Sequence, residues 1–229
     1  MEIKNLTYLL LLLGYLVIPV ILGSQKKVRF VFQLKYLLPA SIFAGAIFVM
    51  WDIRFTELGV WSFNPTYITE IDLLKIPIEE WLAFLIIPLS SVYIYEWLKL
   101  KLEHFEKPNI FIVISLAIFA ISAILAYSHR KNMFTFFTFF LTAIYLGYTI
   151  FRNRFKKHYT KFYLAYAISL VPFLIISAIL NIFPVIIYNT DHIIGTAILG
   201  IPVEKFAYLF MLLLINITIY EYLNERQHY

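Results

Sequence analysis

Seven long apolar runs constrain this chain more than any other feature of its sequence. At a rise of about 1.5 Å per residue, a helix of this length crosses a hydrocarbon core roughly 30 Å thick. No run alternates between polar and apolar residues as a barrel strand does. The sequence therefore predicts an all-α membrane protein of about seven transmembrane helices, at about residues 5–23, 31–50, 78–98, 109–127, 133–151, 162–180 and 203–223.

The composition agrees with a membrane protein. Hydrophobic residues make up 62% of the chain and charged residues 14%, whereas soluble domains have roughly half and a quarter. The net charge of +5 comes from Lys and Arg in short connectors, so we expect membrane lipid, and no nucleic acid, as the partner. The chain has no cysteine, which excludes disulfides and thiol chemistry.

The distribution of basic residues predicts the orientation in the membrane. Lys and Arg number four after helix 1, with Lys35 at the start of helix 2 included, and three, five and one after helices 3, 5 and 7. They number only one, two, two and none at the N-terminus and after helices 2, 4 and 6. By the positive-inside rule, the N-terminus lies outside and the C-terminus lies in the cytoplasm. The first apolar run is followed directly by Lys26 and Lys27, which predicts a retained anchor in a multi-pass cell-membrane protein.

The two longest external connectors, 51–77 and 181–201, are copies of one another. At an offset of 125, Asn64 matches Asn189, and Ile76-Pro77-Ile78-Glu79 matches Ile201-Pro202-Val203-Glu204. The copies lie four helices apart, so they point the same way through the membrane and form a parallel repeat. We expect a first three-helix unit at 1–105, a spacer helix at 106–130 and a second three-helix unit at 131–229.

The repeated Pro-x-Glu motif is the strongest candidate for chemistry. Proline fits the first turn of a helix, so Glu79, Glu80 and Glu204 are expected at the outer start of their helices. The helix terminus favours an ionised carboxyl group, whereas apolar burial favours a protonated one that can act as a general acid. Alternatively, each motif is an ordinary helix start whose glutamate is exposed at the membrane interface and takes no part in chemistry. Asn64 and Asn189 would orient these acids or, alternatively, stabilise turns.

Aromatic residues crowd the expected external side, where their faces could stabilise a carbocation and hold a long hydrocarbon. Most fit an interfacial aromatic belt. Trp61, Trp81 and Phe206 are the substrate-binding candidates, the last two because each follows its matched Glu by two residues. Glu96 and Glu221 are also matched, and their aromatic neighbours favour interfacial anchoring.

Other reaction types lack support in the sequence. There is no Gly-rich nucleotide motif and no Asp-rich pair for magnesium. Asp191, His192 and Glu204 share the external side, but their spacing is not typical of metal ligands. We therefore expect no metal and no cofactor.

These residues resemble the membrane-embedded lycopene cyclases of the two-subunit type, in a fused single-chain form. The resemblance covers both halves and is carried by Trp51-Asp52, by Gly59-Val60-Trp61-Ser62-Phe63-Asn64-Pro65, by Pro77-Ile78-Glu79-Glu80-Trp81 and by Pro202-Val203-Glu204. It implies a cofactor-independent isomerisation of lycopene, a non-redox cyclisation that gives γ-carotene and β-carotene in carotenoid biosynthesis. A terminal double bond is protonated, a neighbouring double bond attacks the cation, and a proton leaves.

One residue departs from the pattern. The resemblance implies a second acid in the later motif, but this chain has Lys205, so the two halves cannot be chemically equivalent. We expect Glu79 and Glu80 to act at the acid step, and Glu204 to orient the substrate or take the final proton.

Other functions stay open at this stage. A carotenoid hydratase would trap the same cation with water. A retinal-binding seven-helix photoreceptor would use Lys205, although that residue lies only one turn into its helix. A transporter would also fit a parallel repeat, although no ionisable residue lies near a helix centre. The sequence leaves the ring type, the number of ends cyclised and homo-oligomer formation undecided.

Overall fold

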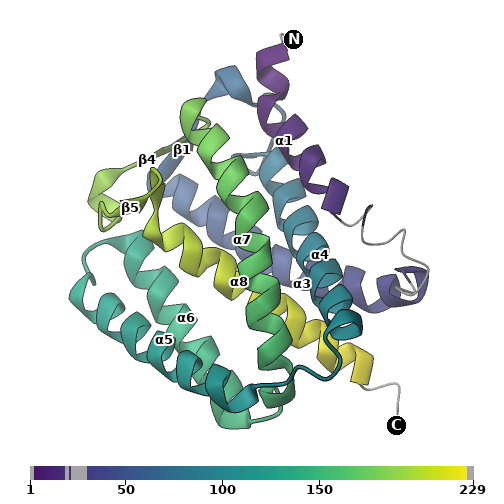
Figure 1. Ribbon diagram of the computed structural model, residues 1–229. Helices are drawn as coiled ribbons and strands as arrows, with labels where there is room; N and C mark the ends of the chain where they lie inside the picture. The colour runs from purple at the N-terminus through teal and green to yellow at the C-terminus, as the bar shows by residue number, and fades with distance from the viewer. Residues whose placement is uncertain (1–2, 19–20, 22–29, 226–229) are drawn as a thin grey trace.

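The computed structural model describes residues 3–18, 21 and 30–225, and it is predominantly helical (Figure 1). Six helices of the described residues are long and apolar enough to span a membrane. The expected first span extends beyond the described residues, and α1 is its described part. The helices are α1 (Thr7–Tyr15), α3 (Phe30–Glu57), α4 (Ile78–Lys101), α5 (Pro108–Ser128), α6 (Met133–Arg152), α7 (Tyr159–Ile182) and α8 (Val203–Glu225).

Both long connectors fold into the same short elements. The first contains β1 (Trp61–Phe63), a 3₁₀ turn (Pro65–Tyr67), β2 (Asp72–Leu73) and β3 (Ile76–Pro77). The second contains β4 (Ile186–Tyr188), a 3₁₀ turn (Thr190–His192), β5 (Ala197–Ile198) and β6 (Ile201–Pro202). Strand β2 pairs with β3, and β5 pairs with β6. Their two-residue turns match even in backbone conformation, because Leu74 and Leu199 both have φ 54°.

The two connectors pair with each other through β1 and β4. The pairing is antiparallel, with Trp61 opposite Tyr188, Ser62 opposite Ile187 and Phe63 opposite Ile186. Ser62 and Ile187 are themselves repeat mates at the offset of 125, so they lie on the axis that relates the two halves. The pairing therefore confirms a tandem repeat in which the connectors meet at a local two-fold axis.

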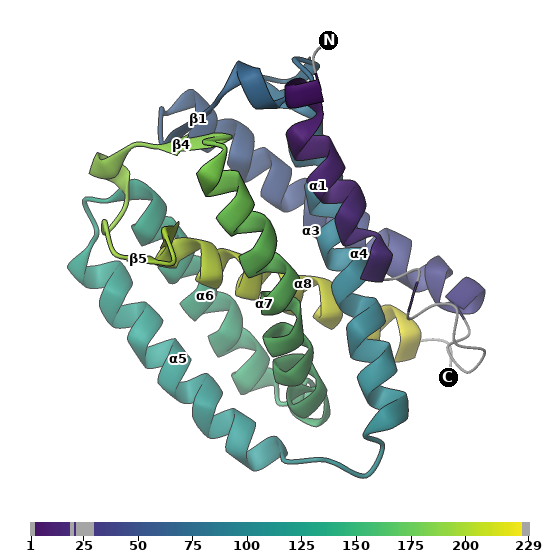
Figure 2. The same ribbon diagram turned by 45° about the horizontal axis from the view of Figure 1, so that its top comes forward.

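The helices interlock across this axis. Helix α3 packs against α4 of its own half and α8 of the other, while its repeat mate α7 packs against α8 and α4. Helices α1 and α6 flank this centre against α4 and α8, and α5 lies outside against α6 (Figures 1 and 2). The outer helices expose many apolar side chains, such as Val113 and Ile121 of α5, as expected for lipid-facing helices.

Helix α3 is longer than its apolar run predicts. The hydropathy pattern ends at residue 50, but the helix continues to Glu57. Trp51, Asp52 and Phe55 therefore lie on a helix rather than in a connector, and Asp52 and Phe55 are buried. The reason is that a hydropathy window ends at the first polar residues, although those residues can still face the interior of the bundle.

An ion-pair network closes the opposite end of the bundle. Lys99 donates to Glu96 at 2.9 Å and to Glu221 at 2.8 Å, which ties α4 to α8. The hydroxyl of Tyr95 lies 2.8 Å from Nδ1 of His158 on the adjoining 3₁₀ turn. Glu96 and Glu221 thus form ion pairs within the protein, whereas the sequence predicted only that they anchor the helix ends at the membrane interface.

The termini lie at opposite ends of the bundle (Figure 1). Near the N-terminus, the side chain of Asn5 donates to the backbone oxygen of Pro65 in the first connector at 3.3 Å. The orientation with the N-terminus outside and the C-terminus in the cytoplasm stays a prediction. The division into units 1–105, 106–130 and 131–229 also stays a prediction.

Single cysteines test the orientation, because the natural chain contains none. Asp72 in the first connector and Glu103 after α4 are both exposed. We expect Asp72→Cys to react with a membrane-impermeant maleimide in intact cells, and Glu103→Cys to react only after permeabilisation. The natural chain is the control, and the reverse labelling pattern would contradict the orientation.

Candidate active site

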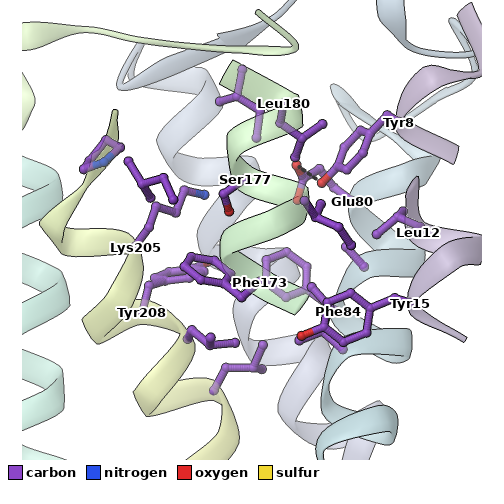
Figure 3. Close-up of a pocket in the computed structure, with 18 of the residues that line it drawn as sticks. Tyr8, Leu12, Tyr15, Glu80, Phe84, Phe173, Ser177, Leu180, Lys205 and Tyr208 are labelled. Carbon is purple, nitrogen blue, oxygen red and sulfur yellow. Dashed lines mark hydrogen bonds between the residues drawn. The ribbon is translucent and has the colours of Figure 1, made fainter. Parts of the chain in front are cut away.

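A pocket lies between α1, α4, α7 and α8 beneath the paired connectors (Figure 3). It encloses about 890 Å³ of empty space, including its open side. Most of its lining is apolar or aromatic, with polar side chains at a few points, among them Tyr8, Glu80, Ser177, Tyr188, Lys205 and Tyr208. A size and lining of this kind suit a largely apolar ligand with one polar contact region.

Glu80 reaches this pocket from the first turn of α4. Pro77 stands at the N-cap in an extended conformation, which fixes where the helix begins. Successive helical residues are rotated by about 100°, so Glu79 and Glu80 point in different directions. Glu80 is only 4% exposed, and its Oε1 accepts a hydrogen bond of 2.8 Å from the hydroxyl of Tyr8.

Asp52 adds a second carboxyl group from α3. It is 1% exposed, and its Oδ1 accepts a 2.8 Å hydrogen bond from the hydroxyl of Tyr208. The carboxyl groups of Asp52 and Glu80 also interact with each other. When two interacting carboxyl groups are both buried, a state in which one of them keeps a proton is favoured. The pair is therefore built to hold a proton inside the protein.

Lys205 approaches the carboxyl pair from α8. Its Nζ lies 5.0 Å from the ring centroid of Trp61, 5.4 Å from Tyr208, 5.6 Å from Tyr188 and 6.0 Å from Phe134. These rings stabilise the ammonium group through cation–π contacts. Burial raises the pKa of the Tyr188 phenol, so the ring stays neutral beside Lys205.

Glu79 and Glu204 face the connectors. Glu79 is fully buried, and its Oε1 accepts a 2.7 Å hydrogen bond from the backbone N–H of Thr69. Glu204, also fully buried, accepts hydrogen bonds from the backbone N–H of Ile194 at 2.8 Å and from the hydroxyl of Thr135 at 2.5 Å. Thr69 and Ile194 are themselves repeat mates. Both glutamates thus hold a connector onto its helix, and neither lines the pocket.

The two matched asparagines stabilise turns. Oδ1 of Asn64 accepts from the N–H of Thr66 at 3.1 Å, and Oδ1 of Asn189 accepts from the N–H of Asp191 at 3.0 Å. Each side chain thereby caps a 3₁₀ turn. The amide of Asn189 also donates to the backbone oxygen of Gly59 at 3.2 Å, across the two connectors. Neither asparagine contacts a carboxyl group of the site.

The three aromatic candidates lie in different places. Trp61 is buried against Lys205. Trp81 donates from its indole N–H to the backbone oxygen of Leu73 at 3.2 Å and lines a separate small cavity between α3 and α4. Phe206 packs edge-on against Phe173 at 5.6 Å, and Phe173 lines the pocket. Phe206 therefore supports the pocket wall from behind.

The pocket belongs to both halves but is not symmetric. The repeat mate of Glu80 is Lys205, and the repeat mate of Asp52 is Ser177. Lys205 and Ser177 both line the same pocket as Glu80. The chain thus has one acid pair at this pocket.

Sequence reasoning missed Asp52, Tyr8 and Tyr208 as members of the site. Asp52 was noticed only as part of the Trp-Asp resemblance. A signal was present, because Phe48, Asp52 and Phe55 follow helical spacing, which places Asp52 on the buried face of an extended α3. Tyr8 had no local signal, since its partner lies 72 residues away.

Of the trio Asp191, His192 and Glu204, the carboxyl group of Glu204 accepts hydrogen bonds from Ile194 and Thr135. Among the described residues, the side chains close enough to share an ion are His158, Glu221 and Glu225 at the opposite end. Two of them already bind lysines: Glu221 pairs with Lys99 at 2.8 Å, and Glu225 pairs with Lys157 at 2.8 Å.

Comparison with known proteins gives one family assignment. A family model described as lycopene cyclase matches residues 5–98 and again residues 131–223. The two matches correspond to the two three-helix repeats, and α5 lies between them. No curated protein and no solved structure matches this chain significantly.

The connector contacts of Glu79 and Glu204 predict a loss of stability on truncation. A hydrogen bond to a charged group contributes about 1.5–3 kcal/mol, and in a protein of this size each kcal/mol shifts the melting midpoint by roughly 2–4 °C. We expect Glu79→Ala and Glu204→Ala each to lower the midpoint of the detergent-solubilised protein by about 3–10 °C. Exposed Glu103→Ala is the matched control, and unchanged midpoints would contradict this role.

Proposed function

This chain belongs to the lycopene cyclase family, and we propose that it closes rings at the linear ends of lycopene, giving γ-carotene and then β-carotene. The observation that carries the proposal is the pair of buried carboxyl groups, Asp52 and Glu80, beside a largely apolar pocket. Family membership supports an enzyme of carotenoid cyclisation and a polyene substrate. The site supports an acid–base mechanism that needs no redox change.

Glu80 is the proposed acid because it is the carboxyl group that lines the pocket. Its proton adds to the terminal double bond of the substrate and leaves a carbocation. The neighbouring double bond then attacks the cation and closes the ring. A carboxylate of the pair removes a proton from the ring, which restores the acid and leaves the mass of the substrate unchanged.

Charge balance supports this assignment. With Lys205 protonated, one carboxyl group ionised and the other neutral, the site has no net charge. After proton transfer, two carboxylates face one ammonium group and one carbocation, so the net charge is still zero. An uncompensated buried charge costs several kcal/mol, so neutrality throughout the reaction favours the cationic intermediate.

The mechanism also needs pocket walls that stabilise a carbocation and exclude water, and aromatic rings can do both. Phe84, Phe173 and Tyr208 line the pocket around the acid, as Figure 3 shows. Their faces can stabilise the cation, and their bulk limits the access of water. Exclusion of water favours ring closure over hydration, and the two products are separated by mass spectrometry because hydration adds one water.

We assign Glu79, Glu204, Asn64 and Asn189 to holding the connectors over the site. This assignment differs from the sequence-based prediction, in which Glu79 acted at the acid step and Glu204 oriented the substrate or took the final proton. The side-chain hydrogen bonds of these four residues go to the connectors or to Thr135, which supports a positioning role.

Amide substitutions test the assignment in a lycopene-accumulating host. A general acid typically contributes 10²- to 10⁴-fold, so we expect Glu80→Gln and Asp52→Asn each to lower cyclisation by at least about 100-fold. Glu79→Gln keeps an acceptor for Thr69 and should stay within about threefold of the natural chain at equal protein level. Full cyclisation by Glu80→Gln would overturn its role as the acid.

A single acid pair also predicts the course of the reaction. Lycopene has two linear ends, and only one of them can reach Glu80 at a time. The first ring must therefore leave the pocket before the other end enters. We expect a time course with purified protein to show monocyclic γ-carotene rising and then falling as β-carotene forms. Appearance of β-carotene without a monocyclic intermediate would contradict a single site.

A further inference from the structure

A second, apolar cavity lies between α4 and α7 beyond the pocket, and we call it the groove. It holds about 910 Å³ of empty space, including its open side. Ile94 and Trp97 of α4 form one wall, Ile168, Val171 and Ile175 of α7 form the other, and two isoleucines that follow α1 complete the lining. Every lining residue is apolar, so the groove offers no partner for a polar ligand.

The groove and the pocket lie on the same seam between α4 and α7. Along α4, Glu80 and Ile87 line the pocket, and Ile94, two turns beyond Ile87, lines the groove. Residues two turns apart share one face of a helix, so along α4 the groove follows the pocket. Along α7, the neighbours Phe173 and Pro172 line the pocket and the groove respectively, so on this helix the two spaces lie on different faces at the same depth.

Tyr15 marks the boundary between the two spaces. It lines the pocket, and its hydroxyl lies 3.4 Å from the backbone oxygen of Ser169 on α7. In Figure 3 its ring lies at the opposite end of the pocket from Leu180 and Tyr8. A long molecule that leaves the acid end must pass this point before it reaches the groove.

The far side of the groove is open to the membrane. Val171 is 58% exposed and Ile175 is 57% exposed, and both lie midway along a helix that spans the membrane. A hydrocarbon could therefore enter sideways from the lipid without crossing water.

We propose that this groove binds the unreacted half of the polyene while the other end is at Glu80. The inference rests on the proposed cyclisation. A conjugated chain is stiff and cannot fold back inside the pocket, so its remainder must continue in a straight line. It carries no polar atoms, which matches the lining, and the face of α4 that presents Glu80 to the pocket also forms a wall of the groove.

Paired tryptophan substitutions test the groove. Val171→Trp fills it, and Val113→Trp on α5 is the matched control, since Val113 is 65% exposed and lies outside the groove. Each variant is assayed with lycopene and with a truncated linear polyene that keeps one terminal group but ends before the groove. We expect Val171→Trp to raise KM for lycopene at least about tenfold, the loss expected when two or three buried carbons are displaced.

The same variant should change KM for the truncated polyene by less than about twofold, and Ile175→Trp should repeat the pattern. Unchanged lycopene kinetics would overturn the proposal and leave membrane lipid as the occupant. An equal loss with both substrates would also overturn it. If the natural chain converts neither substrate, the cyclisation proposal fails instead, and the groove is then judged by lycopene retained on purification, which Val171→Trp must reduce.

Discussion

The antiparallel pairing of β1 with β4 determines how the two halves of this protein meet. Backbone hydrogen bonds of 2.9 Å from Asn64 to Val185 and from Asn189 to Val60 extend the pairing symmetrically. Trp61 and Tyr188 stand opposite one another in this pairing, and both rings contact Lys205. The same interaction that joins the halves therefore positions the ammonium group of the second half beside the acids of the first.

Much of the fold could be predicted because it follows from local pattern. Apolar length predicted the spanning helices, proline predicted the starts of α4 and α8, and the offset of 125 predicted the repeat. Hydropathy alone did not predict the end of α3, although the helical spacing of Phe48, Asp52 and Phe55 was a signal of it, and the contact of Asp52 with Tyr208 could not be predicted. That partner lies 156 residues away, and no local pattern reports such a contact.

The site was predicted only in part, and the reason is physical. Residues that match between the halves serve what both halves share, and both halves need their connectors fixed to a helix start. Glu79 and Glu204 do this through equivalent backbone donors, Thr69 and Ile194. The polar groups at the pocket are instead positions where the halves differ. Matching therefore predicted Glu79 and Glu204 together with Glu80, and it gave no indication of Asp52.

Divergence at these positions has an electrostatic cause. A strictly repeated site would place four carboxyl groups around one axis in a medium of low dielectric constant, where unpaired negative charges are costly. Replacing one acid by Lys205 and another by Ser177 leaves two carboxyl groups and one ammonium group, a set that can be neutral with one proton to transfer. A fused chain allows this change, because each half can be altered separately. The two halves are thus alike in fold but different in charge at the pocket they share, and this difference is why we propose a single reaction centre there.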